Sequence, residues 1–288
     1  MKDKFFVLIL LGTLILGIMT GCDKKEDEII MFSGYCGAEG DGSNLMWTLN
    51  DEGVLTISGT GAMKNYYRIT SFNLAPWGEH VYLLKSLVIK KGVTHIGTNA
   101  FYGCGFTGSL TIPNSVKTIG GSAFSDCRGF TGGLTIPNSV ETIGEHAFYC
   151  CSSFTGSLTI PNSVKIIGWY AFYSCRSFTG SLTIGNSVET IGRWAFAFCD
   201  GFTGSLTIGN SVKTIEEMAF YYCNGFTGDL TIPKSVVTID GYAFYNCSGF
   251  TGRLTIPKSV NLGAYAFGGC SGFTSFYQAT NAGETNIQ

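Results

Sequence analysis

Hydrophobic residues recur along most of the chain in a phrase of about 24 residues, which occurs eight times with small changes. Its clearest copy, residues 129–151, reads GFTGGLTIPNSVETIGEHAFYCC. The leucine that begins each strand-like run falls at Leu87, Leu110, Leu134, Leu158, Leu182, Leu206, Leu230 and Leu254. Self-similarity at a period of roughly 20–50 residues is typical of chains in which every repeat forms one turn of a solenoid. The pattern therefore predicts eight stacked rungs.

The first half of each unit has the alternation of a short β-strand. In the copy quoted above, Leu134 and Ile136 point to one side and Thr135 to the other, as in a strand with one buried face. Residues 137–139, Pro-Asn-Ser, are turn formers that redirect the chain after this strand. Stacked copies are therefore expected to build a parallel sheet along one face of the solenoid.

The second half of the unit is predicted to return to the core and to form a short helical turn. Val140 and Ile143 are apolar and three positions apart, so both can reach the core. Ala147 and Cys151 are four positions apart, and one turn of helix would place them on the same face with Phe148 beside them. The prediction is a row of short helical turns opposite the sheet.

The segment before the repeats is predicted to be a β cap. Residues 45–49 and 54–58 alternate between apolar and polar positions, and Asp-Glu-Gly at 51–53 supplies a hairpin turn. A solenoid needs such a cap because its terminal rung would otherwise expose the core. The predicted organisation is a signal peptide over 1–21, a lipidated charged tether over 22–33, an N-terminal β cap over 34–86, eight repeats over 87–273 and a C-terminal cap or tail over 274–288.

The N-terminus has the features of a bacterial export signal. Lys2 and Lys4 precede an apolar stretch over residues 5–18 that is too short to span a bilayer comfortably. The stretch leads into Met-Thr-Gly-Cys, which resembles the lipobox of bacterial lipoproteins, in which cleavage precedes an acylated cysteine. We therefore expect Cys22 to be lipidated and to attach the protein to a membrane. An ordinary signal peptide that contains a cysteine is the alternative.

The charged run that follows Cys22 is predicted to be a solvated tether. Residues 23–28 read Asp-Lys-Lys-Glu-Asp-Glu, a composition that cannot pack into a core. The run also resembles the lysine-then-acidic signal that directs lipoproteins of Bacteroides-like bacteria to the outside of the outer membrane. The expected location is therefore the bacterial outer membrane, with the protein lipid-anchored and facing the extracellular side.

Composition argues against nucleic acid and against catalysis. The formal net charge is −2, and no basic run follows the predicted signal peptide, so nucleic acid is a poor candidate partner. The three histidines, His80, His95 and His146, stand in unrelated contexts, and the chain has no nucleophile elbow or phosphate-binding loop. His146 and Cys150 could form a Cys–His pair, but no third group is evident to orient it. We expect no enzyme activity and no cofactor.

Eight of the 11 cysteines occupy one position of the repeat. They are Cys104, Cys127, Cys151, Cys175, Cys199, Cys223, Cys247 and Cys270. In-register side chains point in parallel, which leaves their Cβ atoms too far apart for good disulfide geometry. A single file of cysteines also lacks the four converging ligands that zinc requires. The expectation is a buried ladder of free thiols that pack as small hydrophobic groups; the redox states of Cys36 and Cys150 stay open.

The positions that vary between copies are the candidates for function. One column alternates in charge down the stack and is expected to form cross-rung ion pairs: Lys117, Glu141, Lys165, Glu189 and Lys213. A second column, just before each Ala-Phe pair, is rich in aromatic residues and predicts a ligand-binding stripe if it faces solvent. With the neighbouring tryptophan, the candidate binding residues are Trp169, Tyr170, Trp194, Tyr242 and Tyr265. The alternative is that these rings only cover the seam between rungs.

The phrase LTIPxSVxTIGxxAFxxC resembles the Treponema-type leucine-rich repeat of BspA-like bacterial surface proteins. The preceding LMWTLNDEGVLTISGTGAM…APW is similar to the segment that precedes such arrays, and together the two cover residues 34–273. Most copies here have 24 residues, whereas the usual unit of that family has about 23. The resemblance implies a β-rich leucine-rich-repeat solenoid with a parallel sheet on one face and irregular or helical-turn structure opposite.

The same resemblance implies a cell-surface role in adhesion to host proteins or to other cells. The expected partner is a host extracellular or cell-surface protein, and a glycan is an open alternative. Two other functions stay open at this point: a glycan-capture module that serves an uptake system, and a structural spacer of the cell envelope that binds nothing in particular.

Overall fold

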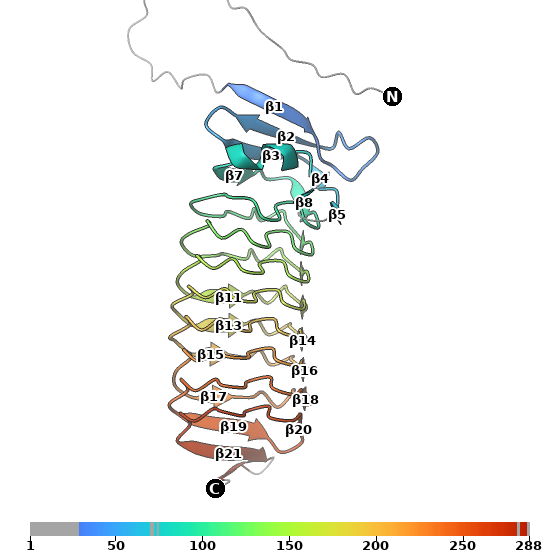
Figure 1. Ribbon diagram of the computed structural model, residues 1–288. Helices are drawn as coiled ribbons and strands as arrows, with labels where there is room; N and C mark the ends of the chain where they lie inside the picture. Colours follow the sequence, from blue (N-terminus) through green and yellow to red (C-terminus); the bar gives the residue numbers. More distant parts are fainter. Residues whose placement is uncertain (1–28, 70–71, 74, 281–282, 287–288) are drawn as a thin grey trace, which may run out of the picture.

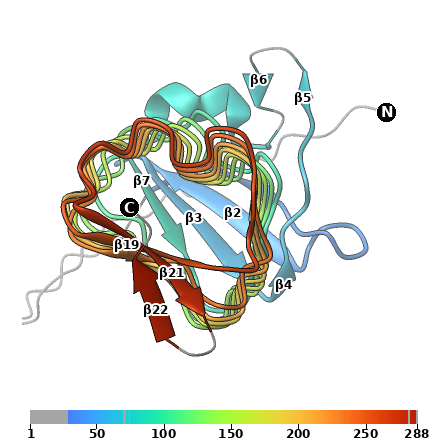
Figure 2. The same cartoon turned by 90° about the horizontal axis from the view of Figure 1, so that it is seen from below.

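The computed structural model of the chain describes residues 29–69, 72–73, 75–280 and 283–286. The predicted signal peptide, the lipidation candidate Cys22 and residues 23–28 lie outside these ranges. Figure 1 shows the repeats stacked above one another, with a small sheet at each end of the stack. Viewed along the solenoid axis in Figure 2, the rungs nearly superimpose. The predicted eight-rung leucine-rich-repeat solenoid with parallel strands is therefore confirmed.

The elements fall into three groups along the described part of the chain. The cap contains β1 (Ile30–Tyr35), β2 (Leu45–Asn50), β3 (Val54–Gly59), β5 (Arg68–Ile69), β6 (Phe72–Asn73), the 3-10 helix η1 (Gly78–Leu83) and β7 (Ser86–Ile89). The long ladder contains β4 (Gly61–Ala62), β8 (Val93–Ile96), β9 (Thr118–Ile119), β10 (Thr142–Ile143), β12 (Ile166–Ile167), β14 (Thr190–Ile191), β16 (Thr214–Ile215), β18 (Thr238–Ile239) and β20 (Asn261–Leu262). The other strands are β11 (Leu158–Ile160), β13 (Leu182–Ile184), β15 (Leu206–Thr207), β17 (Leu230–Thr231), β19 (Arg253–Pro257), β21 (Ser275–Thr280) and β22 (Gly283–Asn286).

The continuous parallel ladder runs through the Thr-Ile pair of each repeat rather than through its Leu-Thr-Ile run. Within residues 61–262 it joins nine strands in the order β20-β18-β16-β14-β12-β10-β9-β8-β4. The corresponding run of the first repeat is β7, which pairs with the cap, and the Leu-Thr-Ile runs of the later repeats form strands from Leu158 onward, in the sheets β11-β13-β15 and β17-β19-β21-β22. The glycine after the Thr-Ile pair permits this close approach: a Cβ on Gly168 would lie 2.6 Å from the backbone N of Glu145 in the preceding rung.

The predicted helical turns are tight turns of another kind, and no α-helix occurs in the described residues. In the rung of Ala147, Tyr149 N donates to His146 O at 3.0 Å and Cys151 N donates to Phe148 O at 3.1 Å, within the turn. The N–H groups between them bond to the next rung instead, as when Phe148 N donates to Ala171 O at 2.8 Å. In an α-helix these N–H groups would bond to carbonyl groups four residues earlier in the same segment, so cross-rung bonding excludes a helix here.

The core consists of columns of identical side chains. Phe124 and Phe148 stack at 5.3 Å between ring centroids, and Phe172 and Phe196 at 5.1 Å, each pair one rung apart. A second phenylalanine column at Phe106 and its equivalents packs edge-on against the first. These rings are essentially inaccessible to solvent, as are the valine, isoleucine and alanine columns. Each rung therefore buries its apolar side chains against the same side chains of its neighbours.

The predicted hairpin is confirmed as β2–β3, which pairs Trp47 with Ile57 in antiparallel register. β1 adds to β2 on one side, and β3 pairs in parallel with β7, so the cap sheet continues into the first rung. β1 begins at Ile30, so the folded cap starts before the predicted boundary at residue 34. Trp77 closes the core end by stacking on Phe101 at 5.4 Å. At the other end β21 extends the stack in parallel and β22 pairs with it antiparallel.

The predicted charge column forms one ion pair. Lys117 Nζ lies 3.6 Å from Glu141 Oε1, and no other pair forms among the five column residues, all of which are described. Backbone bonds fix the register of these rungs instead: Glu141 N donates to Lys117 O at 2.8 Å. Within the described residues, no helix has the length and apolar character needed to cross a membrane.

Candidate functional site

The cysteine ladder belongs to the scaffold. All ten cysteines in the described residues are free thiols, which confirms the prediction for the ladder. Seven of them donate from Sγ to the carbonyl oxygen of the phenylalanine in the preceding rung at 2.9–3.1 Å: Cys127, Cys151, Cys175, Cys199, Cys223, Cys247 and Cys270. Burial raises the pKa of the Cys104 thiol to about 12. These protonated thiols are therefore hydrogen-bond donors as well as small hydrophobic groups.

The histidines are not brought together. His80 stacks on Phe32 at 3.9 Å in the cap, and His95 Nε2 lies 3.0 Å from Asn65 Oδ1. His146 stacks on Tyr170 in the next rung, and burial lowers the pKa of its imidazole. Among the described residues, no group of three His, Cys, Asp or Glu side chains is placed to hold a metal ion.

The predicted column forms, and its aromatic rings stack wherever they fall in successive rungs, while Met218 separates Trp194 from Tyr242. His146 and Tyr170 lie parallel at 4.8 Å between centroids, Tyr170 and Trp194 at 5.8 Å, and Tyr242 and Tyr265 at 5.4 Å. The column is half-buried along its length, and Tyr265 at the end is 66% exposed. Trp169 is 49% exposed and precedes Tyr170, at a different position of the repeat.

Every residue of this column has a left-handed backbone. The φ values are 56° at Tyr170, 58° at Trp194, 57° at Tyr242 and 53° at Tyr265. Bulky side chains are rare in this region because Cβ crowds the following carbonyl. Cross-rung bonds from the N–H groups at this position hold the conformation in every rung but the last; Trp194 N, for example, donates to Glu217 O at 3.1 Å.

A second aromatic column runs beside the first, and the sequence reasoning missed it. It comprises Tyr149, Tyr173, Tyr221 and Tyr245; in the rung where Ala197 takes the column position, the next residue, Phe198, packs edge-on against Tyr173 and Tyr221. Tyr149 and Tyr173 are parallel at 4.9 Å, and Tyr173 lies 6.0 Å from the Trp194 ring. The available signal was that tyrosine directly follows the Ala-Phe pair in most copies. We call the two columns, from His146 to Tyr265, the aromatic face.

The aromatic face presents ring edges and hydroxyl groups to solvent. Stacked rings cover one another's faces, so their edges and Tyr hydroxyls are what a partner can reach. Burial and neighbouring groups raise the pKa of Tyr149 to about 12, and burial also raises the pKa of Tyr173, so these hydroxyls stay neutral donors. Arg176 lies 5.7 Å over the Phe198 ring and adds a positive charge at the edge of the face.

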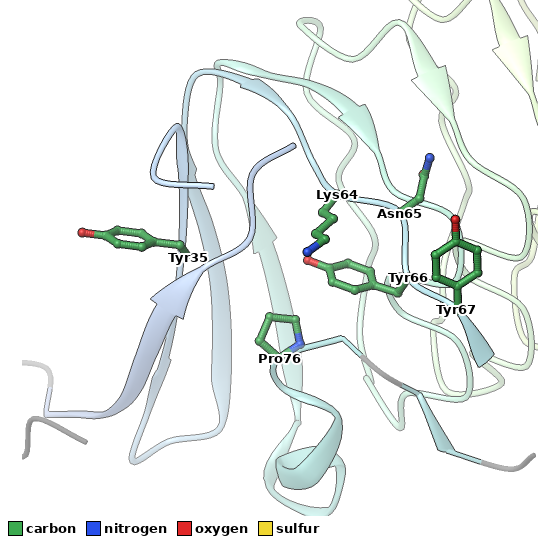
Figure 3. A pocket seen from close by; sticks show the side chains of 6 residues that line it. All are labelled: Tyr35, Lys64, Asn65, Tyr66, Tyr67 and Pro76. Atoms are coloured by element: carbon green, nitrogen blue, oxygen red, sulfur yellow. The ribbon is translucent and has the colours of Figure 1, made fainter. Parts of the chain in front are cut away.

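A second candidate lies in the cap, where a hollow of about 420 Å³ is lined by Tyr35, Lys64, Asn65, Tyr66, Tyr67 and Pro76. Figure 3 shows Lys64, Tyr66 and Pro76 grouped together and Tyr35 on a separate strand. Its polar groups already hold the cap together and join it to the first rung. Tyr66 Oη donates to Cys36 O at 3.4 Å, and Asn65 Oδ1 accepts from Thr98 N at 2.8 Å. We assign this hollow a structural role.

Comparison with known proteins places the repeats in a family. The family model described as BspA type Leucine rich repeat region matches residues 79–203 and 198–286, with six copies. No curated protein matches the chain. Among solved structures, a leucine-rich repeat protein from Bacteroides ovatus ATCC 8483 is 21% identical with a TM-score of 0.55, and the match covers 89% of this chain and 71% of that one.

Two other solved structures are similar over most of the chain. The T. pallidum Leucine Rich Repeat protein is 24% identical with a TM-score of 0.48, covering 82% of this chain and 90% of that one. A leucine rich cell surface protein from Faecalibacterium prausnitzii A2-165 is 19% identical with a TM-score of 0.38, covering 84% and 94%. At these identities, the B. ovatus match supports the fold alone.

Proposed function

Since the chain belongs to the family of BspA type leucine rich repeat proteins, we propose that it is a cell-surface protein that binds host or neighbouring-cell proteins through the aromatic face, without catalysing a reaction. The export signal and the lipobox-like sequence at Cys22 support display on the outer membrane through a lipid anchor. The charged run over residues 23–28 supports a spacer between the lipid and the solenoid.

The observation that carries this proposal is the run of half-buried side chains over successive rungs, which are aromatic except for Met218 in the first column. From His146 to Tyr265 the first column spans five rung steps, about 24 Å at roughly 4.8 Å per step. Tyrosine, tryptophan and arginine, which this face combines, are the residue types enriched at the energetic centres of protein interfaces.

Stacking also favours a protein partner over a glycan on this face. Sugar rings bind aromatic side chains through the ring faces, and here each face is occupied by the ring of the next rung, as at Tyr170 and Trp194. Edges and hydroxyls suit the mixed apolar and hydrogen-bonding contacts of a protein surface. A glycan-capture module and a spacer that binds nothing are therefore the outcomes that a binding test must separate from this proposal.

The test is binding of the full mature chain to immobilised extracellular-matrix proteins and, in parallel, to polysaccharides. We expect binding to a protein, and we expect Trp194→Ala combined with Tyr242→Ala to weaken it by roughly 30-fold or more. Tyr82→Ala is the matched control, since Tyr82 is 79% exposed on η1 of the cap, outside the aromatic face. Equal binding by the double variant and the control would exclude the aromatic face as the binding surface.

Anchoring is tested separately on cells. Cys22→Ser should move the protein out of the membrane fraction, because the acylated sulfur would be lost. Protease added to intact cells should digest the unmodified protein if it faces the extracellular side. Retention of Cys22→Ser in the membrane fraction would contradict the lipid anchor, and complete protection from protease would contradict surface display.

A further inference from the structure

The second aromatic column is interrupted in the rung that precedes His146, where the first column has not yet begun. Ser122 and Ser125 occupy the two column positions there, between Tyr102 in the rung before and Tyr149 in the rung after. The interruption leaves a hollow of about 520 Å³ that is open to solvent. We call it the aromatic slot, and its lining is Tyr102, Ser122, Ser125, Asp126, His146, Tyr149 and Tyr170. We propose that the aromatic slot binds a neutral hexopyranose ring.

One wall of the slot is formed by aromatic faces rather than edges. Tyr149 lies parallel to Tyr173 with an interplanar angle of 4°, so its other face is turned toward the serine rung. His146 is stacked on Tyr170 in the same way, with an angle of 10°. On the opposite side Tyr102 lines the hollow from the preceding rung. The aromatic face, by contrast, offers no such gap between successive stacked rings at Tyr170 and Trp194.

The floor and side of the slot carry hydroxyl and carboxylate groups. Ser125 is 3% exposed, and its Oγ donates to Asp126 Oδ2 at 3.5 Å. Arg128 Nη2 donates to Asp126 Oδ1 at 2.9 Å and Arg128 Nε to the same atom at 3.3 Å. A ligand hydroxyl can donate to the carboxylate and accept from the Ser122 hydroxyl, which suits a ring that carries several hydroxyl groups.

Charge in the slot selects a neutral ligand. The Asp126 carboxylate is neutralised by Arg128, so the pair offers hydrogen bonds without a net charge to attract an ion. Burial holds the pKa of His146 below its ordinary value, so its imidazole is uncharged near neutral pH. An anionic sugar or phosphate would find no unpaired cation here, and a cationic ligand would compete with Arg128 for the carboxylate.

The width of the slot favours a ligand with a puckered ring over one with a flat ring. The walls stand two rungs apart, about 10 Å at roughly 4.8 Å per rung. A flat aromatic ring held between two rings needs only about 7–8 Å, from two carbon–carbon contacts of about 3.5–4.0 Å. The chair of a hexopyranose is thicker than a flat ring and presents axial C–H groups to both walls of the slot. It therefore fills the gap of about 10 Å, which a nucleobase or an indole would fill only in part.

The proposal is tested by saturation-transfer NMR on the full mature chain with the methyl glycosides of mannose, glucose and galactose. We expect saturation transfer to at least one of them, with adenosine as a flat-ring probe that shows less. Ser125→Tyr should abolish the transfer, because tyrosine at this column position completes the stack between Tyr102 and Tyr149. The same position holds tyrosine in most other rungs, so the variant is compatible with the fold.

Two further variants make the result decisive. Tyr149→Ala removes one wall and should weaken binding of the same glycoside by roughly tenfold, whereas Tyr245→Ala, at the equivalent position remote from the slot, should leave it unchanged. Circular dichroism melting shows whether each variant is folded, and the Tyr149→Ala result decides if Ser125→Tyr is not. The proposal is overturned if none of the three glycosides receives transfer, if Tyr149→Ala binds the glycoside as tightly as the unmodified chain, or if adenosine binds in their place.

The slot and the aromatic face can be separated by experiment. Trp194 and Tyr242 do not line the slot, so Trp194→Ala with Tyr242→Ala should keep the glycoside signal while it weakens protein binding. Ser125→Tyr should do the reverse. Failure of the slot proposal would appear in the glycoside signal, and failure of the proposed function would appear in protein binding, so the two failures can be told apart.

Discussion

Raising the pH to about 9.5 should destabilise the solenoid strongly, because the ladder thiols resist ionisation only while they are folded. Burial raises the pKa of seven of them above the ordinary value of 9.0: Cys104, Cys127, Cys151, Cys175, Cys199, Cys223 and Cys247. Above that value the unfolded chain loses protons that the folded chain keeps. The contribution of the protonated thiols to the free energy of unfolding is therefore fully present below about pH 9, and it declines as the pH rises toward their folded pKa values.

Linkage sets the magnitude. Between about pH 7.5 and 9.5 each thiol that ionises only in the unfolded chain removes about 0.8 kcal/mol of stability. Seven such thiols remove about 6 kcal/mol, against a total of about 5–15 kcal/mol for an ordinary domain. Buried tyrosines act in the same direction but at higher pH, because an unfolded tyrosine ionises only near pH 10. The thiols should therefore dominate the loss in this interval.

The assay is guanidinium unfolding under reducing conditions, followed by circular dichroism at both pH values. With a denaturant slope of about 5 kcal/mol per molar, the midpoint should fall by roughly 1 M. Cys175→Ser is the matched control: its hydroxyl can still donate to the Phe148 carbonyl that Cys175 Sγ contacts at 3.1 Å, but it does not titrate in this range. The control should lose about 0.8 kcal/mol less between the two pH values. A midpoint that is the same at both pH values would refute the reasoning.

Two further predictions concern rung packing and thiol access. Gly168→Ala should lower stability by about 1–3 kcal/mol in chemical unfolding, because its Cβ would lie 2.6 Å from backbone atoms of the preceding rung. Gly133→Ala, whose Cβ would meet its nearest atom at 3.9 Å, should change stability by less than about 0.5 kcal/mol, and equal losses would contradict the close-approach argument. In a Cys22→Ser chain, a thiol reagent should modify half-buried Cys150 first and the remaining nine cysteines only after denaturation. Rapid modification of several thiols in the native protein would show that the ladder is open to solvent.

The repeat period and the identity of the core could be predicted from the sequence. Every rung surrounds a given position with the same neighbours. All the residues in one column, such as the column of Phe148 or that of Cys151, must therefore be buried together or exposed together. The cap hairpin could also be predicted, because the alternation of apolar and polar residues on either side of Asp-Glu-Gly at 51–53 is a local signal. The aromatic column at Tyr170 was also found, because its members differ from copy to copy while the core residues do not.

Contacts between rungs decided the rest. The spacing of Ala147 and Cys151 is compatible with a helical turn within one unit, but alternate N–H groups bond to the next rung and exclude it. The choice of the Thr-Ile pair for the continuous ladder likewise depends on how closely glycine backbones of successive rungs approach, as at Gly168. These bonds join residues about one repeat apart, and the sequence of a single unit contains no information about which of its N–H groups they use.

The candidate sites divide in the same way. The sequence by itself determined that aromatic residues vary at one register, but only stacking across rungs decided that their edges face solvent and that a second column lies beside them. The aromatic slot exists because Ser122 and Ser125 fall in the same rung, between intact rings at Tyr102 and Tyr149. A gap in a column is a property of three successive rungs, so it arises only when the chain is stacked.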